Sequence, residues 1–339
     1  MTVADPNNLQ AVASAADLSI ATVSKILGGK YKGNTPKGRE RVARVIELAK
    51  RMGYIANASA RRLRRGSHHA MIVVTPVDDF GQPSVFTSEF IFGINHALRD
   101  QERSMILHAY PRTGGAESAQ PLPKERFYDG ALVLDALGGV DRLLARAGVP
   151  AAYINVYPSP SKLTFLRDER AAGSDLARAL AGLGYRRLLV VGEIGHHHEG
   201  HPSYPQRWAG ISETAKECGL EVDVLPDAWW FGTIGKKFPA ARIDPGTVVI
   251  AMDVHTVLAV VQVMKPDTPI ACVDDCHLLY ESYRGLTRVG HDRMAMGRMA
   301  ADMLMARIAN PIAEVSIAPV RGEVFIGSST PPCSVARLV

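Results

Sequence analysis

Two hydrophobic patterns divide the chain near residue 70. Before it, apolar residues recur every three or four positions, as in Leu9, Val12, Ala13 and Ala16, which is typical of short amphipathic helices. Beyond it, short runs rich in Val, Ile, Leu and Ala alternate with helical patterns. The pattern therefore predicts an all-α head followed by an α/β body.

The head is predicted to contain a helix-turn-helix. Turn chemistry at 17–19 ends the first helix, and Ser19 is a suitable N-cap for a second helix over 20–27. A third helix begins with Thr35 as its cap and Pro36 at its first position. A second helix placed this way offers its N-terminal residues to the major groove of DNA. The predicted outward residues of the second helix are Ile20, Ala21, Ser24 and Lys25, and the predicted inner residues of the third are Val42, Val45, Ile46, Ala49 and Met52.

Positive charge is concentrated in the same part of the chain. Residues 1–66 hold thirteen Lys and Arg against four Asp and Glu, a net charge of +9, whereas the whole chain carries only +5. The remainder therefore sums to −4. This segregation favours one module that binds a polyanion and another that does not.

An arginine-rich segment follows the third helix. In residues 54–66, Asn57 can cap a helix of one or two turns, and four arginines surround Leu63. A helix this short is not stable alone, so we expect it to become ordered only on a binding partner. An apolar side chain between guanidinium groups suits a wedge in the minor groove of DNA.

The body reads as doubly wound α/β units. Its predicted strands are apolar on both faces, as central parallel strands must be. Predicted strands lie at 71–75, 105–107, 131–134, 151–154, 188–191, 247–250 and 270–273, and predicted helices at 88–99, 141–147, 171–183, 205–218 and 254–264.

The chain resembles the lac repressor (LacI/GalR) family of bacterial transcription regulators. The resemblance rests on residues 9–13, 19–25, 35–41, 53–55 and 57–63 and continues into the C-terminal region. It implies a body of two doubly wound parallel-sheet lobes like that of periplasmic sugar-binding proteins. The lobes are expected at about 70–160 with 290–320, and at about 163–287 with the tail. The expected domains are a helix-turn-helix head (1–53), a hinge helix and linker (54–69) and a two-lobed effector-binding and dimerisation domain (70–339).

The same resemblance assigns DNA contacts. Base-facing positions are Ile20, Ala21 and Lys25, phosphate contacts include Thr22 and Ser24, and Leu63 is the hinge wedge. Two departures stand out: Ile20 and Ala21 are apolar where many relatives carry hydrogen-bonding groups, and Ala56 replaces the usual proline. Apolar groups can contact thymine methyls but cannot make bidentate hydrogen bonds. The predicted DNA-binding set is Ser19, Ile20, Ala21, Thr22, Ser24, Lys25, Asn57, Ala60 and Leu63.

Ligands of open α/β sheets bind beyond the carboxyl ends of the strands. The resemblance gives Arg207 and Asp274 the role of binding effector hydroxyls and places Asn155 in the same cleft. An arginine beside a carboxylate suits a polyol, since each hydroxyl can accept from one and donate to the other. The alternative for Arg207 and Asp274 is an ion pair that bridges the lobes or lies on the surface.

Around this predicted cleft the sequence departs from the family pattern. Residues 251–253 are Ala-Met-Asp where many members have Asn-Asp, which leaves Asp253 as the polar group. Phe86 could present an aromatic face to a sugar ring, as could Trp229 or Trp230. The effector could therefore be a less common sugar, a sugar acid or a sugar phosphate. The predicted effector set is Phe86, Asn155, Arg207, Asp253 and Asp274.

No other motif predicts chemistry. The cluster 196–201 holds four histidines and a glutamate, but consecutive histidines cannot all face one ion, and a mobile loop is the preferred interpretation. The four cysteines lack metal-binding spacing. Since the sequence has no phosphate-binding loop and no catalytic motif, we expect no cofactor, no metal and no catalytic residue.

The sequence thus predicts a ligand-responsive repressor without enzymatic activity. It would bind a palindromic operator as a homodimer, or as a tetramer, and hold a sugar or related effector between the lobes. Without a signal peptide or membrane segment, it is expected in the cytoplasm, at the nucleoid. The alternatives are a soluble sugar-binding module and a sugar-modifying enzyme, although Asp274 and Asp275, the only tempting catalytic pair, would point opposite ways on a strand.

Overall fold

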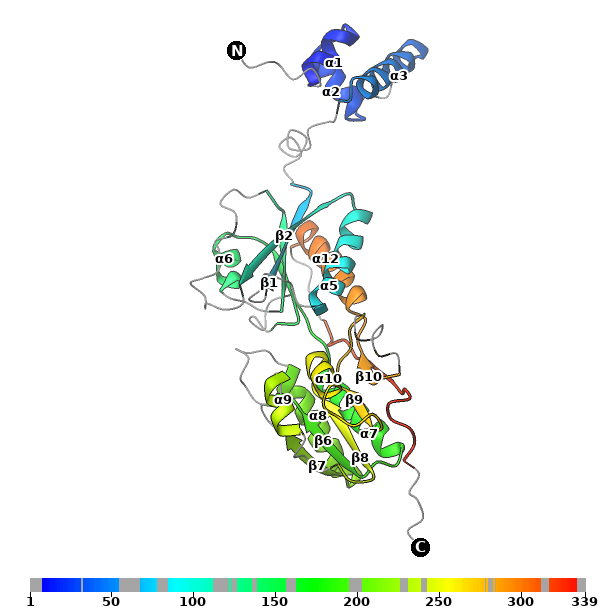
Figure 1. Cartoon of the computed structure of the whole chain (residues 1–339). Helices are drawn as coiled ribbons and strands as arrows, with labels where there is room; N and C mark the ends of the chain where they lie inside the picture. Colours follow the sequence, from blue (N-terminus) through cyan, green and yellow to red (C-terminus); the bar gives the residue numbers. More distant parts are fainter. Residues whose placement is uncertain are drawn as a thin grey trace. The chain divides into compact units, whose positions relative to one another are not determined.

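A computed structural model of the chain divides into two units, 1–68 and 69–339, which are described separately. Figure 1 shows the three-helix head and the two sheets of the body. The structure describes residues 8–31, 33–54, 68–77, 85–111, 122, 127–135, 139–156, 163–194, 203–225, 231–238, 243–277, 279, 283, 285–311 and 317–333.

The head consists of helices α1 (Leu9–Ala16), α2 (Ile20–Leu27) and α3 (Pro36–Arg51). A side-chain oxygen caps each one: Asn8 accepts from the amide of Ala11 at 2.8 Å, Ser19 from Thr22 at 3.2 Å, and Thr35 from Gly38 at 3.1 Å. These caps satisfy amides that have no partner inside the helix. The predicted helix boundaries in the head are confirmed.

A small apolar core holds the three helices together. Its buried residues come from all three helices and include Val12, Val23, Ile26, Val45 and Ala49. The prediction that Ile46 faces this core is wrong, because its side chain is 40% exposed. On α3 the buried stripe follows Val45 and Ala49, four residues apart, and Ile46 lies about a third of a turn away from it.

The N-terminal lobe of the body is a parallel sheet with the strand order β2-β1-β3-β4-β5 among the described residues. Every residue of β1 and β3 is buried, because helices cover both faces of the sheet. The elements of this lobe are β1 (Ala70–Val77), α5 (Val85–Asp100), β2 (Ser104–Pro111), β3 (Gly130–Leu134), α6 (Val140–Arg146), β4 (Ala151–Ile154), β5 (Leu163–Phe165) and α12 (Arg293–Ala309).

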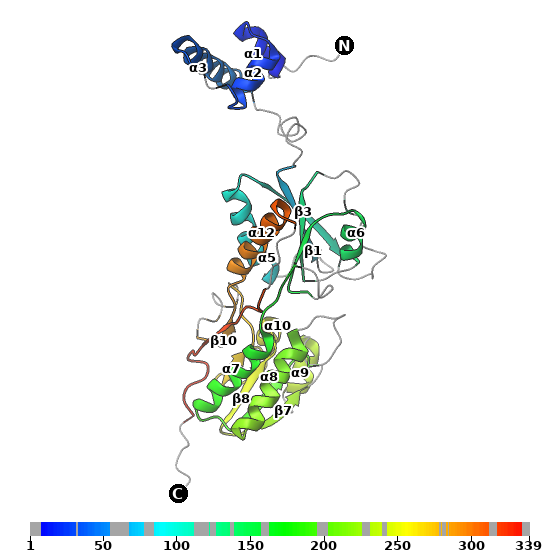
Figure 2. The same cartoon turned by 180° about the vertical axis from the view of Figure 1, so that it is seen from behind.

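The C-terminal lobe has the strand order β11-β10-β9-β8-β6-β7 among the described residues, and there only the β10–β11 pair is antiparallel. Helices α7 and α8 lie together on one face of this sheet, as Figure 2 shows from behind. The elements are α7 (Glu169–Gly182), β6 (Arg187–Val191), α8 (Ser203–Cys218), β7 (Glu221–Leu225), α9 (Phe231–Lys237), β8 (Thr247–Ala251), α10 (Val254–Val260), β9 (Ile270–Cys272), β10 (Thr287–Gly290) and β11 (Glu323–Phe325).

The chain crosses between the lobes at three points. It leaves β5 for α7, returns from β10 to α12, and crosses again after α12 to reach β11. Two crossings pair with each other through a parallel bridge between Arg167 and Val320. The prediction of two doubly wound parallel-sheet lobes is confirmed. The helix α12 is absent from the predicted elements, although it contributes Met296, Ala300 and Leu304 to the N-terminal core.

The cysteines form no disulfide, and two of them are buried in a core. All four cysteines are free, and Cys272 and Cys276 are packed in the C-terminal core, as expected of thiols that fill space. Among the helices that the structure describes, none has the length and apolar content needed to cross a membrane.

Each lobe contains a pair of helices that cross at glycines. In the N-terminal lobe, a Cβ on Gly93 of α5 would lie 1.9 Å from the carbonyl oxygen of Met294 in α12. In the C-terminal lobe, a Cβ on Gly173 of α7 would lie 2.3 Å from the carbonyl oxygen of Arg207 in α8. Both contacts involve backbone atoms that a rotamer change cannot relieve. The absence of a side chain therefore sets how closely α8 lies against α7.

We expect Gly173→Ala to lower the free energy of unfolding by about 1–3 kcal/mol, because the added methyl group must push α8 away from α7. Gly182, at the end of the same helix, is the matched control, since a Cβ added there would meet no atom within 4 Å. Gly182→Ala should be neutral or slightly stabilising, because alanine restricts the unfolded chain. Urea denaturation of the two variants measures the difference, and equal stabilities would contradict the close crossing.

Candidate functional site

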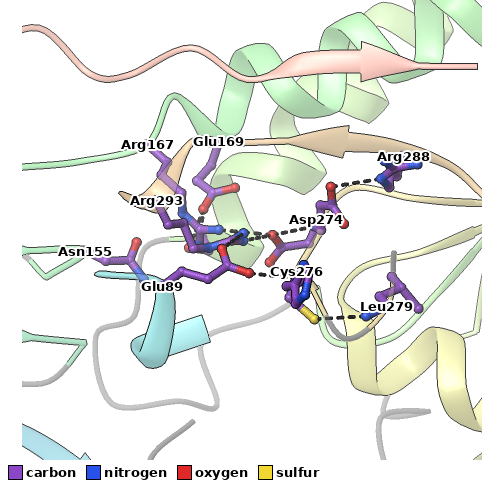
Figure 3. A network of polar contacts seen from close by, with 12 residues as sticks. Glu89, Asn155, Arg167, Glu169, Asp274, Cys276, Leu279, Arg288 and Arg293 are labelled. Carbon is purple, nitrogen blue, oxygen red and sulfur yellow. Dashed lines mark hydrogen bonds and ion pairs between the residues drawn. The ribbon is translucent and has the colours of Figure 1, made fainter. Parts of the chain in front are cut away.

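The polar centre of the body is Asp274, which follows strand β9 in the C-terminal lobe. Its carboxylate accepts from Arg167 at 3.1 Å, from Arg207 at 2.7 Å and from Arg293. The amide of Asp275 donates to it as well, at 2.8 Å. Figure 3 shows Arg167 and Arg293 on one side of this carboxylate. Three of these four donors contact Oδ1 and one contacts Oδ2, so both oxygens of Asp274 have partners within the protein itself.

Arg207 is the second element of this centre. It projects from α8 and is only 1% exposed. Its Nε donates to Glu169 Oε2 at 2.7 Å, and its Nη2 donates both to Glu169 Oε1 at 3.2 Å and to Asp274 Oδ2 at 2.7 Å. Its Nη1 donates to the carbonyl oxygen of Met252 at 2.5 Å. Four of its five N–H groups are thus used, and the close crossing at Gly173 holds its backbone against α7.

The arginines keep the buried carboxylates ionised. Burial alone would raise the pKa of Glu169, but the charges of Arg167 and Arg207 and the hydrogen bond from Arg207 outweigh it and lower the pKa to about 2. Burial would likewise raise the pKa of Asp274, yet the three arginines hold it well below its usual range. Burial lowers the pKa of the Arg167 guanidinium, and its two carboxylate partners offset this only in part.

Two side chains of the N-terminal lobe complete the network. Arg293, the first residue of α12, donates to Asp274 of the other lobe and lies 3.4 Å from Oε2 of Glu89 on α5. The other oxygen of Glu89 accepts from the amide of His277, which follows Asp274 in the C-terminal lobe, at 2.7 Å. These contacts join α5 and α12 to the segment 274–277 across the boundary between the lobes.

Phe86 also reaches across this boundary. It lies near the start of helix α5 but packs against the core of the C-terminal lobe, with its ring centroid 6.0 Å from that of His255. The guanidinium of Arg293 lies over the same ring at 5.1 Å from its centroid. In this structure the aromatic ring is therefore in contact with protein groups.

The remaining predicted effector residues, Asp253 and Asn155, follow strands of the two different lobes. Asp253 caps α10 through the amide of Thr256 at 2.8 Å and accepts from the hydroxyl of Tyr204 at 2.9 Å. In the N-terminal lobe, Asn155 donates to Asp135 at 2.9 Å after the end of β4. The structure thus brings Arg207 and Asp274 into direct contact and places Asp253 and Asn155 at strand ends in the two lobes.

Sequence reasoning missed four members of this network: Glu89, Arg167, Glu169 and Arg293. Glu169 and Arg293 each follow an aspartate N-cap, Asp168 and Asp292, and this signal marks the start of a helix at a strand end. The chain between β5 and α7, which contains Arg167, carries no comparable signal. Nothing in the pattern around Glu89 distinguishes it from a solvated helix residue.

Within the described residues, no group of three or more His, Cys, Asp or Glu side chains could hold a metal ion. The histidine cluster 196–201 and the pair Trp229 and Trp230 lie outside the described residues. The hinge residues Asn57, Ala60 and Leu63 also lie outside them, so the hinge assignments stay predictions.

The head exposes part of the predicted DNA-binding set. On α2, the side chains of Ile20, Ala21 and Lys25 are exposed. Those of Thr22 and Ser24 are half-buried. Ile20 is 46% exposed at the N-terminal end of the helix, and the hydroxyls of Ser19 and Thr22 lie 2.8 Å apart beside it. An exposed apolar side chain can contact thymine methyls, and the hydroxyl groups beside it can donate to phosphate oxygens.

The fold and the network define a class of protein: a helix-turn-helix head joined to a two-lobed body with a charged centre between its lobes. A model of the periplasmic binding protein-like domain matches residues 177–330. Two curated relatives are similar to the chain. The transcriptional regulator RafR of Escherichia coli is 26% identical over 221 residues, which are 64% of this chain and 63% of RafR. The maltose regulon regulatory protein MalI of Escherichia coli K12 is 28% identical over 198 residues, which are 57% and 55% of the two chains.

The matched segments therefore span 55% to 63% of these two relatives. Solved structures extend the likeness of the fold. The lac repressor dimer bound to operator and the anti-inducer ONPF has a TM-score of 0.77 with this chain, at 16% identity over 96% of this chain and 100% of that one. The regulator CelR in complex with cellobiose has a TM-score of 0.64 at 21% identity over 95% and 99%. The resemblance to the lac repressor family is confirmed.

Proposed function

We propose that the chain is a sequence-specific, DNA-binding transcriptional regulator, a repressor whose affinity for a palindromic operator is set by a small effector between its lobes. The observation that carries this proposal is that one chain contains both a helix-turn-helix head and a two-lobed body. The head presents Ile20, Ala21 and Lys25 on an exposed helix, and the body contains a periplasmic binding protein-like domain. The curated relatives RafR and MalI are regulators, which supports the proposal.

The proposed mechanism links the two parts through the hinge. One head makes too few contacts for tight specific binding, whereas two heads on a dimeric body can read both halves of a palindrome. An effector that changes the angle between the lobes would alter the spacing of the two hinges, and DNA must then change effector affinity by the same factor. The chain would act in the cytoplasm, at the nucleoid, without enzymatic activity.

A homodimer is the proposed assembly, with a tetramer as the larger alternative. On the N-terminal lobe, Phe92 is 59% exposed and Leu107 is 49% exposed, and apolar side chains this open are suited to contact a second copy. The lac repressor, which shares the fold, has been solved as a dimer on its operator. Light scattering of the full chain with and without DNA measures the stoichiometry.

The proposed function is tested by selecting random duplexes on the full-length protein. We expect the recovered DNA to share a two-fold symmetric site, and binding to that site to weaken steeply as salt rises, because phosphate contacts release counterions. Lys25→Ala should reduce binding to the site. Recovery of DNA without any common sequence would contradict a specific regulator, and turnover of a sugar would favour the alternative of a sugar-modifying enzyme.

Leu63→Ala tests the proposed hinge separately. If Leu63 enters a base step as a wedge, the substitution should weaken operator binding far more than binding to unrelated duplexes. The measurement is fluorescence anisotropy with both kinds of DNA at one salt concentration. An equal loss on both would remove the wedge from the mechanism.

A further inference from the structure

The network between the lobes contains three arginines and three carboxylates, and one carboxylate is held more loosely than the others. The side chains of Glu169 and Asp274 are each 4% exposed, and contacts of 2.6 Å and 2.7 Å join them to the arginines. Glu89 is 19% exposed, and its oxygen lies 3.4 Å from the nearest nitrogen of Arg293. Of the three carboxylates, the one farthest from its arginine is thus also the one that comes from the N-terminal lobe.

The neighbouring acids have partners of their own. Asp275 pairs with Arg288 at 2.8 Å, outside the set around Asp274. Asp253 accepts hydrogen bonds from the amide of Thr256 near the start of α10 and from the hydroxyl of Tyr204. Among the described groups that contact one another around Asp274, charge is therefore balanced only while Glu89 is in place. Without it, three arginines, Arg167, Arg207 and Arg293, face two carboxylates.

Arg293 has the donor groups that a further acceptor needs. Its side chain is 1% exposed, and its Nε has no hydrogen-bond partner within the part of the chain that the structure describes. The same holds for Nε of Arg167. Beside the long contact to Glu89 and the bond to Asp274, three of the five N–H groups of Arg293 are unused by the described residues. The fork of a guanidinium matches the two oxygens of a carboxylate or phosphate.

Glu89 itself shows how an acid group is held here. One of its oxygens meets the guanidinium of Arg293, and the other accepts from the amide of His277 at 2.7 Å. A backbone N–H and a guanidinium on the two oxygens of a carboxylate are the contacts that an acidic ligand would receive in a protein site. Since Glu89 belongs to α5 of the N-terminal lobe, its release would also free one contact between the lobes.

We propose that Glu89 occupies the place of an acid group of the effector, and that the effector is a polyol bearing a carboxylate or a phosphate, which displaces Glu89 from Arg293 and His277. This inference rests on the proposed function, because it takes the cleft between the lobes to be the effector site. Exchange of Glu89 for a ligand carboxylate leaves the network neutral, and a phosphate, with a charge between about −1.5 and −2, supplies at least the negative charge that Glu89 takes away. A neutral polyol that displaced Glu89 would leave the buried guanidinium of Arg293 with Asp274 alone, a carboxylate that Arg167 and Arg207 also use, and this loss of negative charge is unfavourable.

The test compares probes that share a skeleton and differ in the acid group. D-glucose, D-gluconate and glucose 6-phosphate are titrated calorimetrically into the full-length protein and into the variants Glu89→Gln and Arg293→Met. Gluconate or glucose 6-phosphate should bind at least about tenfold tighter than glucose, a difference of about 1.4 kcal/mol. The arm that binds identifies the acid group as carboxylate or phosphate. Glu89→Gln should tighten that binding, because it removes the competing charge, and Arg293→Met should abolish it.

Glu213→Gln is the matched control, since Glu213 is a half-exposed partner of Arg170 on the outer face of α7 and α8 and should leave binding unchanged. Tighter or equal binding of glucose, no response to any of the three probes, or no gain in Glu89→Gln would each overturn the inference. Glu89 is partly exposed, so this variant stays informative even if Arg293→Met does not fold. Operator binding of the same preparations without sugar is measured in parallel, and its loss would instead contradict the proposed function.

Discussion

Replacing Arg207 with alanine should lower the free energy of unfolding of the C-terminal lobe by about 3–5 kcal/mol. The substitution removes the hydrogen bonds to Glu169 and to Asp274 and leaves both carboxylates buried with fewer counter-charges. The carbonyl oxygen of Met252 also loses its donor. An ionised carboxylate without its partner cannot be hydrated in this interior, so the cost falls on the folded state.

Urea denaturation followed by tryptophan fluorescence measures this loss, because all three tryptophans, Trp208, Trp229 and Trp230, occur between β6 and β8 in the sequence. The matched control is Arg170→Ala. Arg170 pairs with Glu213 across the same two helices, but both side chains are at least 50% exposed. The control should cost no more than about 1 kcal/mol. Similar losses in both variants would mean that the buried pair contributes little beyond an exposed one.

An Arg207→Ala variant that no longer responds to an effector can have lost either a direct contact with the effector or the stability of the C-terminal lobe. The sequence predicts a direct contact between Arg207 and effector hydroxyls, whereas the structure shows a guanidinium with four of its five N–H groups used by protein. A variant that loses its response and is also much less stable would not demonstrate a direct contact. Glu89→Gln separates the two roles better, because the side chain that it alters is partly exposed.

Local signals account for most of what the sequence predicts correctly. The runs that become β1, β3, β6 and β8 are apolar along almost their whole length, because both faces of a parallel sheet are covered. Caps such as Ser19 and Thr35 act over three residues, so the boundaries of the head helices follow from short windows of sequence. The placement of Asp274 near the other polar groups follows from its position at a strand end.

The failures concern information that no short window contains. The helix α12 is rich in Ala and Met on all sides and shows little periodicity, and its packing on α5 depends on Gly93, about 200 residues earlier in the sequence. The strands β5 and β11 are three residues long and are defined by their neighbours. The partners Glu89 and Arg293 reach the segment around Asp274 only because the chain crosses between the lobes, so no spacing in the sequence relates them.

Acidification between pH 6.5 and pH 4 should destabilise the body through one histidine. His291 lies in the crossing between β10 and α12 and is 6% exposed, and neither of its ring nitrogens has a hydrogen-bond partner in the part of the chain that the structure describes. Burial, together with the nearby charges of Arg167 and Arg293, lowers its pKa to about 4, against the opposing effect of Glu169 and Asp274. The folded protein therefore holds this imidazole neutral.

The direction of this pH effect on the free energy of unfolding follows from which state, folded or unfolded, binds the proton. Between pH 6.5 and pH 4 the unfolded chain has taken up a proton at His291 and the folded chain has not, so the free energy of unfolding falls as the pH falls. Over this window the loss amounts to about 3 kcal/mol, and above pH 6.5 this group causes no change. Glu169, whose pKa is lowered, acts in the same direction but only below its ordinary pKa of 4.5. Burial raises the pKa of Asp275 from 3.8, which gives the opposite sign in the acidic range.

Substitution of His291 isolates this contribution. Urea denaturation of wild type and His291→Met is measured at intervals from about pH 8 to about pH 4.5, and the difference between the two curves cancels the carboxyl groups that both proteins share. The difference should be constant above pH 6.5 and should then shift steadily in favour of the variant, since methionine takes up no proton when the chain unfolds. Parallel curves across the whole range would mean that His291 is protonated equally in the folded and unfolded chains.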